Sequence, residues 1–533
     1  MVKRIQVDQS RRNAARRQRR VAARHRLAGH WGEQPTPMFT SGKITYEIGG
    51  NMEATPYGGL AAMHRLVTKL GLPAAIDQQL TLLKMHLPYH ESDHVLNLAY
   101  NVLTGGTRLE DIERLRHDVA FMNAVGADLI PDPTTAGDFC RRFTEADIVA
   151  LMDAINTVRP TLWAGRGRGL LSGVAYIDVD GTIVPTSGQR KAGIGLSYKG
   201  IWGYAPLIVT LANTREVLYL VNRPGNAPSH QDAATWIDKA LDLVVPYAPR
   251  VCLRGDTDFS LTAHLDRWAE RADFVFGMDN IAVLRRHAEQ LAAAAWRRLQ
   301  RPPAYETKTG QRRARRENTK QAIVHERGYL SLRLDHEDVA EFTYRPGKCQ
   351  RSYRVVVVRK NISRTRGDHA LFDEIKYFFY ITTYTDRSAE QIIELAAAGR
   401  AEQADQPTAD RTAEQVVELA NDRCDQENII GQLKSGIAAL RVPLYDLLSN
   451  WAYMLIAALA WNIKAWFALM MHRKTDRHDY IRMEFHRFFH SVVLIPAMIL
   501  RRARGITVRL VGYTPALNRL FSAWTTIERL RFG

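Results

Sequence analysis

Residues 174–180 read VAYIDVD, an apolar run that ends in the carboxylate of Asp180. Two more apolar runs follow after a polar interval, PLIVTLA at 206–212 and VLYLVN at 217–222, and a short turn separates them. Short apolar runs rich in β-branched residues and bounded by turn residues are typical of buried strands. This part of the chain therefore predicts three strands, the last two of which form a hairpin.

Beyond these strands the sequence alternates between helical and strand patterns. The alternating elements are a helix at 231–244, a strand RVCLRGD at 250–256, a helix near 261–271 and a strand DFVFGM at 273–278. Three strands followed by this alternation is the element order of a ribonuclease-H-like α/β domain, in which the first and fourth strands are neighbours. Asp180 and Asp256 would then lie at the C-terminal ends of adjacent strands, where open α/β sheets place their sites.

The remaining patterns divide the chain into further regions. The predicted fold class is α/β, with a ribonuclease-H-like catalytic domain, an inserted β-rich domain, an N-terminal helical domain and a C-terminal helical region. We expect a basic disordered arm at 1–30, a helical DNA-binding domain at 31–168, a catalytic domain formed by 169–278 and 387–440, a β-rich basic insertion at 279–386 and the C-terminal helical region at 441–533.

The composition indicates a polyanionic partner. The chain has 533 residues and a formal net charge of +17, and residues 1–26 hold ten Lys or Arg against one acid. Such an excess of positive charge favours binding to nucleic acid. The candidate DNA-binding arginines are Arg11, Arg12, Arg16 and Arg17 of the arm, and Arg312, Arg313, Arg315 and Arg316 of the insertion. Trp296 and Tyr305, beside the second group, could stack on an unpaired base or pack within the fold.

Two observations bear on the compartment. The four cysteines are scattered without a Cys-x-x-Cys pair, which fits a reducing cytoplasm. The apolar stretch 451–471 resembles a membrane span, but it stands alone and contains Asn462 and Lys464. A buried helix is the expected structure, with no association with a membrane.

A predicted helix at 411–436 carries a third carboxylate. Arg423, Glu427 and Lys434 stand at positions i, i+4 and i+11, which an ideal α-helix places within about 40° of one another. A salt-bridge stripe on the surface would give the same pattern. The functional interpretation is a glutamate that binds a metal ion, flanked by two cations that contact phosphates.

Three carboxylates at Asp180, Asp256 and Glu427 would suffice for phosphodiester cleavage with two divalent metals. That chemistry needs hard oxygen ligands around two ions about 3.5–4 Å apart. Mg²⁺ is the expected cofactor, and Mn²⁺ is a possible substitute. Because a metal ion can generate the attacking nucleophile, the protein need not supply a separate base.

These motifs resemble those of DDE transposases from the bacterial insertion-sequence group with a Y-x2-R-x3-E-x6-K signature. Arg423, Glu427 and Lys434 match its spacing, but Ala420 stands at the tyrosine position. Further matching segments are Asp180-Gly181-Thr182, Arg254-Gly255-Asp256-Thr257-Asp258-Phe259, YKGIWGYAPLIVTLA at 198–212 and RPGNAPSHQD at 223–232.

The resemblance implies what the protein acts on. It implies cut-and-paste transposition, by cleavage and strand transfer, on double-stranded DNA that carries terminal inverted repeats and on target DNA. Since two transposon ends must be joined, it also implies a homodimer on DNA, in the bacterial cytoplasm at the nucleoid.

Alternatives remain at this point. Asp178 shares a strand face with Asp180, and Asp258 follows Asp256 by two residues, so either could replace its neighbour as a ligand. The segment IDVDGTIV also resembles the nucleophile loop of haloacid-dehalogenase-type phosphatases, with Asp178 as nucleophile and Asp180 as acid and base. A DNA-binding protein without catalytic activity is the third possibility.

Overall fold

The computed structural model describes residues 12–13, 15–24, 26, 45–46, 52–167, 169–188, 190–299, 330–366, 369–370, 374–385, 387–398, 425–502, 505–512 and 516–530. The chain forms two compact units. The helical unit comprises Met1–Arg166, Arg190–Ala192 and Gln432–Gly533, and the sheet unit comprises Gly167–Gln189 and Gly193–Gly431. Among the predicted site residues, Arg11, Arg423 and the four arginines at 312–316 lie outside the described residues.

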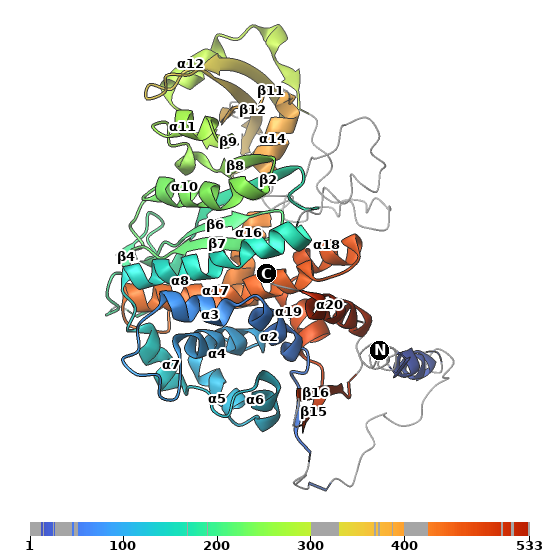
Figure 1. Ribbon diagram of the computed structural model, residues 1–533. Coiled ribbons are helices and arrows are strands. Elements are labelled where there is room, and N and C mark those ends of the chain that lie inside the picture. The colour runs from blue at the N-terminus through green and yellow to red at the C-terminus, as the bar shows by residue number, and fades with distance from the viewer. Residues whose placement is uncertain are drawn as a thin grey trace. The chain divides into compact units, whose positions relative to one another are not determined.

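The sheet unit is built on a large mixed sheet (Figure 1). Its first five long strands are β2 (Val174–Gly181), β6 (Leu207–Leu211), β7 (Glu216–Val221), β8 (Arg250–Gly255) and β9 (Asp273–Met278). They lie in the order β7-β6-β2-β8-β9, so that β2 and β8 are parallel neighbours and β6 runs antiparallel to β2. The prediction that the first and fourth strands are neighbours is confirmed. The helix α10 (Ala233–Val244) packs against β2 and β6.

The predicted β-rich insertion continues this sheet. Its strands are β10 (Arg297–Arg298), β11 (Leu330–Tyr344), β12 (Tyr353–Arg366), β13 (His369–Ala370) and β14 (Glu374–Thr382). β14 pairs antiparallel with β9 through four residue pairs, and β12 and β11 follow in order. The pairing covers the edge of β9, which would otherwise present unpaired backbone groups. The sequence pattern does not reveal this continuity, because it shows strands but not their partners.

The helix α14 (Ala389–Ala398) covers one face of the extended sheet. Its Ile392, Ile393 and Leu395 belong to a buried apolar cluster with Tyr176 of β2 and Cys252 of β8. Because side chains alternate along a strand, this is also the face toward which positions 178, 180, 254 and 256 point. The apolar core on the face of the candidate carboxylates is therefore formed by residues of β2 and β8 together with residues of β11, β12 and α14.

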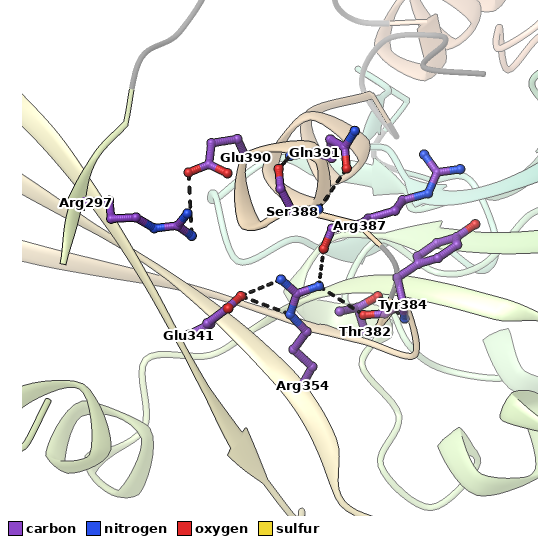
Figure 2. Close-up of polar contacts among 9 residues, drawn as sticks. All are labelled: Arg297, Glu341, Arg354, Thr382, Tyr384, Arg387, Ser388, Glu390 and Gln391. Carbon is purple, nitrogen blue, oxygen red and sulfur yellow. Dashed lines mark hydrogen bonds and ion pairs between the residues drawn. The ribbon is translucent and has the colours of Figure 1, made fainter. Parts of the chain in front are cut away.

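Arg354 of β12 fixes the start of α14 (Figure 2). Its guanidinium binds Glu341 of β11, with Nε 3.0 Å from Oε2, and donates to the carbonyl oxygens of Tyr384 and Arg387. The bond to Tyr384 measures 3.2 Å. One largely buried side chain thus joins two strands to the segment that leads into the helix.

The first turn of α14 closes with a reciprocal cap (Figure 2). The backbone N–H of Ser388 donates to Gln391 Oε1 at 2.8 Å, and the N–H of Gln391 donates to Ser388 Oγ at 3.2 Å. This exchange satisfies backbone donors that have no partner within the helix. Glu390 in the same turn lies 3.8 Å from Arg297 of β10.

The helical unit gathers helices from both ends of the sequence. Its helices are α2 (Leu60–Lys69), α3 (Leu72–Gln79), α4 (Glu91–Leu103), α5 (Ile112–Arg116), α6 (Val119–Val125), α7 (Pro133–Cys140), α8 (Glu145–Thr157), α9 (Arg159–Leu162), α17 (Leu447–Leu469), α18 (Lys474–Arg482), α19 (Phe485–Phe488) and α20 (Leu517–Arg529). α17 packs against α4, α8 and α18.

By length and composition α17 could cross a membrane, but its whole apolar window is buried within the protein. Lys464, inside this window, donates to the carbonyl of Ile481 at 2.6 Å and lies 4.3 Å from the ring of Trp461. A buried lysine is tolerated when its ammonium has such partners. The expectation of a buried helix at 451–471 is confirmed.

The predicted C-terminal helical region at 441–533 contains strands as well as helices. β15 (Ala497–Arg502) and β16 (Gly505–Leu510) form an antiparallel hairpin, and β1 (Ala54–Thr55) pairs with β15. The Ile-Thr-Val run of β16 favours a strand, yet it is short and follows strongly helical sequence. Pairing with β1, about 440 residues earlier in the chain, is a tertiary contact that local pattern does not encode.

We expect Arg354→Ala to loosen α14. The change leaves Glu341 and two carbonyls without a donor, which corresponds to a loss of about 1.5–3 kcal/mol for hydrogen bonds to a charged group. Amide hydrogens at 389–393 should exchange about 10- to 100-fold faster, as measured by hydrogen–deuterium exchange.

Arg351→Ala is the matched control, since Arg351 on the same segment forms an exposed ion pair with Glu270. In this variant the amide hydrogens of α14 should exchange within about twofold of the wild-type rate, because exposed ion pairs contribute little to stability. Equal acceleration in both variants would show that Arg354 does not fix the helix.

Candidate active site

Two predicted carboxylates stand side by side at the ends of β2 and β8. Val179 of β2 lies opposite Gly255 of β8 in the parallel ladder, so Asp180 and Asp256 occupy the next position of each strand. Neighbouring strands lie about 4.7–4.9 Å apart, which brings both residues within reach of a shared ion. Asp180 is half-buried and Asp256 is exposed.

Local hydrogen bonds orient both carboxylates. Asp180 Oδ1 accepts the N–H of Gly181 at 2.7 Å. Asp256 caps a short 3-10 helix, Thr257–Phe259, and its Oδ1 accepts the N–H of Asp258 at 3.0 Å. Of the two alternatives at this strand end, Asp256 is in register with Asp180, whereas Asp258 lies within the following turn.

Asp178, the alternative to Asp180, is engaged in a buried ion pair. Arg254 Nε lies 2.6 Å from Asp178 Oδ1 and Arg254 Nη2 lies 2.8 Å from Oδ2, and both side chains are at most 1% exposed. The guanidinium also lies 4.4 Å from the ring of Tyr176. Burial alone would lower the pKa of Arg254, but the charge and hydrogen bonds of Asp178 hold it above its usual value.

This pair argues against Asp178 as a nucleophile or metal ligand. Both of its oxygens accept from one guanidinium in a bidentate arrangement, away from solvent. Asp178 lies opposite Arg254 in the β2–β8 ladder, so the pair also fixes the register that aligns Asp180 with Asp256. The arrangement assigns Asp178 a positioning role.

Sequence reasoning missed a buried cation near Gly181, the residue that follows Asp180. Arg223 is 4% exposed and donates from Nε to Ala205 and from Nη1 to the carbonyls of Pro228, Ser229 and Gln231, at 2.8–3.2 Å. Its Nη2 has no hydrogen-bond partner among the described residues and lies 3.7 Å from the place a Cβ on Gly181 would take.

Burial lowers the pKa of Arg223 to about 10, so the group stays cationic near neutral pH. The signal was present in the sequence, since Arg223 begins RPGNAPSHQD, but the segment alone gives no direction for its side chain.

Glu427 lies on α16 (Asp425–Gly431), and the position of its side chain is outside the described residues. After Gly431 the chain forms a π-helical turn, Gln432–Gly436, in which Ile437 N–H donates to the carbonyl of Gln432 at 2.8 Å. Lys434 lies in this turn and is exposed. The prediction of one α-helix to 436 is therefore wrong in its last part, and an angle calculated for an ideal α-helix does not carry from Glu427 to Lys434.

The other predicted contacts have mixed outcomes. Arg12, Arg16 and Arg17 lie in a helical segment of the arm that was expected to be disordered, and the first two are exposed. Trp296 is packed within the sheet unit, because Arg359 lies 4.3 Å from its ring centroid. Packing is therefore the better interpretation for Trp296, and Tyr305 lies outside the described residues.

Comparison with known proteins identifies the family. A family model described as transposase DDE domain group 1 matches residues 37–532. The chain belongs to this family. The match makes the protein a DDE transposase, in a family of DNA-cleaving and strand-transfer enzymes that generally use divalent metals.

Other comparisons add little to this assignment. No curated protein matches the chain. A cryo-EM structure of a piggyBac transposase synaptic complex with hairpin DNA is similar at 9% identity, with a TM-score of 0.34 and 81% of each chain covered.

The carboxylates of this transposase fit a divalent metal in part. Asp180 and Asp256 offer carboxylate oxygens at adjacent positions, and oxygen is the ligand that a hard cation requires. Asp180 is half-buried and Asp256 is exposed. Within the described residues no group of three or more His, Cys, Asp or Glu side chains is arranged to hold a metal ion.

We expect Asp178→Ala to destabilise the sheet unit strongly. The change leaves the guanidinium of Arg254 buried without a counter-charge, which costs about 3–5 kcal/mol. The double variant Asp178→Leu, Arg254→Met should recover most of this loss, because it removes both charges and keeps the volume. Urea denaturation followed by tryptophan fluorescence measures both.

Arg250→Ala is the control, since it breaks an exposed pair with Asp273 between the neighbouring strands β8 and β9. Its effect should stay below about 1 kcal/mol. If the double variant were as unstable as Asp178→Ala, uncompensated charge would not be the cause.

Proposed function

We propose that this transposase performs cut-and-paste transposition of a bacterial insertion sequence, by metal-dependent cleavage and strand transfer. The observation that carries the proposal is the parallel pairing of β2 and β8, which aligns Asp180 with Asp256 at one sheet end. Phosphodiester cleavage of this kind needs carboxylates that converge on divalent ions. The family match supports the reaction class.

The strand order supports a ribonuclease-H-like fold for this part of the chain. In sequence order the strands β7-β6-β2-β8-β9 are third, second, first, fourth and fifth, with the first three antiparallel. We assign the catalytic domain to residues 169–278 and 387–440, with 279–386 inserted between them. We assign DNA binding to the helical region 31–168, and residues 441–533 form the C-terminal helical region.

We assign the metal ligands to Asp180, Asp256 and Glu427. Two bound Mg²⁺ ions, or Mn²⁺ in their place, would supply activation of the attacking oxygen and stabilisation of the leaving oxygen. The chain contributes orientation, because the backbone N–H groups of Gly181 and Asp258 donate to the carboxylates of Asp180 and Asp256. Glu427 follows from the matched signature on α16.

DNA is the partner that the charge distribution favours. The net charge is +17, and Arg12, Arg16 and Lys434 carry cations in segments with exposed side chains. Double-stranded DNA with terminal inverted repeats, and target DNA, are the proposed substrates. Joining two ends requires two active sites, so we propose a homodimer on DNA, acting in the cytoplasm at the nucleoid.

The buried ion pair of Asp178 argues against a haloacid-dehalogenase-type phosphatase, because that alternative requires Asp178 as the nucleophile. Asp178 would have to attack a phosphoester, but its oxygens are held by Arg254 in a buried pair. A non-catalytic DNA-binding protein would keep the charge and lose the reaction. Metal-dependent cleavage of DNA separates that alternative from the proposal.

We expect Asp180→Ala, Asp256→Ala and Glu427→Ala each to lower cleavage more than about 100-fold, the upper end of what loss of a supporting group causes. The substrate is a duplex that carries the inverted repeat flanking the gene, with Mg²⁺ present. Binding of this duplex should change by less than about twofold, because hard ligands act on the metal rather than on DNA.

Asp258→Ala is the matched control, an exposed aspartate two residues beyond Asp256. It should retain cleavage. Activity in Asp256→Ala together with loss in Asp258→Ala would move the ligand to Asp258.

We expect Lys434→Ala to remove a phosphate contact. The slope of log K against log salt for duplex binding should flatten by about 0.9, the value for one phosphate on B-form DNA. Arg423→Ala should act in the same way. Cleavage at saturating DNA should fall less than in Glu427→Ala, because the metal ligands remain. Fluorescence anisotropy between 50 and 200 mM salt, roughly the range where such slopes are resolved, measures the effect.

Lys434→Arg keeps the charge and should keep the slope. If Lys434→Ala lost stability or metal affinity while the slope stayed unchanged, the lysine would be a structural cation.

A further inference from the structure

A short hairpin in the sheet unit exposes a cluster of apolar side chains. Its strands are β4 (Gly195–Leu196) and β5 (Trp202–Tyr204), and β3 (Val184–Pro185) pairs with β5 to complete a small sheet. We call residues 196–202 the hairpin tip. Its exposed residues are Tyr198 at 85%, Trp202 at 53%, Leu196 at 47% and Ile201 at 37%. Clustered exposure of this kind marks interaction surfaces.

The hairpin tip is locked by its own hydrogen bonds. Ser197 N–H donates to the carbonyl of Ile201 at 2.9 Å, and Gly200 N–H donates to the carbonyl of Ser197 at 2.9 Å. Ile201 N–H also donates to Ser197 Oγ at 3.1 Å. Gly200 has a φ of +70°, which a residue with a side chain rarely adopts. The two aromatic rings are thus held on a fixed turn, which lowers the entropy lost when a ligand binds.

Two glycines allow the backbone at the base of the hairpin to contact neighbouring backbone closely. A Cβ on Gly203 would lie 2.0 Å from the carbonyl oxygen of Val184, and one on Gly225 would lie 2.3 Å from that of Gly195. Both distances exclude a side chain. The hairpin therefore packs closely against β3 and against the loop after β7. Arg223 donates hydrogen bonds to three carbonyl oxygens of the same loop.

These contacts place the hairpin at the edge of the candidate active site. β3 begins four residues after Asp180, and Thr182 N–H donates to the carbonyl of Pro206 just beyond β5. Thr186 N–H donates to the carbonyl of Trp202 at 3.0 Å. The base of the hairpin is thus hydrogen-bonded to the segment that follows Asp180.

The charge of the hairpin fits DNA. Residues 193–204 contain no acidic residue, and the Lys199 ammonium lies 5.3 Å from the ring of Tyr198. Aromatic rings stack on the faces of bases, and a lysine beside them attracts the phosphate backbone. Trp296 offers less free surface, because it is half-buried and packs against Tyr377 and Arg359.

We propose that the hairpin tip binds unpaired DNA bases by stacking on Tyr198 and Trp202, next to the strand that is cut. This inference rests on the proposed function, because it takes DNA at Asp180 as given. Bases that are unpaired near the cleavage position expose their flat faces, and the rings of Tyr198 and Trp202 can stack on these faces. Every base has such a face, so the binding is tolerant of sequence.

The test compares two DNA probes and uses the full-length chain without metal. One probe is a fluorescein-labelled duplex with a run of unpaired thymines at one end, and the other is the same duplex fully paired. Fluorescence anisotropy gives both dissociation constants. Trp202→Ala and Tyr198→Ala should each weaken binding of the first probe about 5- to 100-fold. Binding of the paired probe should stay within about twofold, and Trp202→Phe should retain most affinity.

Tyr247→Ala is the matched control, because Tyr247 is another exposed aromatic residue of the sheet unit. It precedes the N-terminal end of β8, whereas Asp256 follows the C-terminal end of the same strand, so the control lies at the other end of the strand from the candidate site. It should bind both probes like the wild type. Thermal melting at the wild-type midpoint would show that the variants fold, as expected for exposed side chains. Leu196→Ser provides a second variant if one aromatic change unfolds the chain, and it should weaken the unpaired probe more than the paired one.

Three results would overturn the proposal. Unchanged affinity of the hairpin variants for the unpaired probe would do so, and so would equal losses on both probes. A change of oligomeric state without loss of DNA affinity would instead assign the hairpin to a protein contact. Asp180→Ala separates this test from the proposed function: it should bind the unpaired probe normally, whereas retained cleavage by that variant would refute the carboxylate assignment alone.

Discussion

Asp178 and Arg254 face each other across the parallel strands β2 and β8, where neither side chain reaches solvent. Because side chains alternate along a strand, a slip of one residue would turn Asp180 or Asp256 toward the other face of the sheet. A buried bidentate pair opposes such a slip, since an unpaired charge in the core is strongly unfavourable. The alignment of the two carboxylates depends on this interaction two residues away.

The sheet around this pair is stabilised from parts of the chain that are distant in sequence. β14 covers the edge of β9, and α14 packs its apolar residues onto the face shared by Tyr176 and Cys252. Arg354 then holds the start of α14 against β11 and β12. Strands β11, β12 and β14 and helix α14 are thus part of the support for β2 and β8, because they cover an edge and a face of the same sheet.

Local pattern was sufficient for the strands and for the residues at their ends. β2 and β9 were predicted within a residue of their bounds, because buried strands have short apolar runs and clear turn signals. The choice between Asp178 and Asp180 could not be made that way, since both lie on the same strand face. It required knowing that Arg254 lies opposite Asp178. The same reason explains why the β15–β16 hairpin and the π-helical turn after Gly431 were not predicted: each depends on tertiary contacts or hydrogen bonds that pattern does not show.

The helical unit has a consequence for the order in which the chain can fold during synthesis. α17 is the main partner of α4 and also packs against α8, yet about half of the chain is translated between these helices and α17. At typical rates of translation, α4 and α8 wait roughly 15 to 70 seconds before this partner leaves the ribosome. A copy of the gene truncated before α17 would therefore yield a chain whose early helices lack the apolar partner that α17 supplies, which favours proteolysis or aggregation.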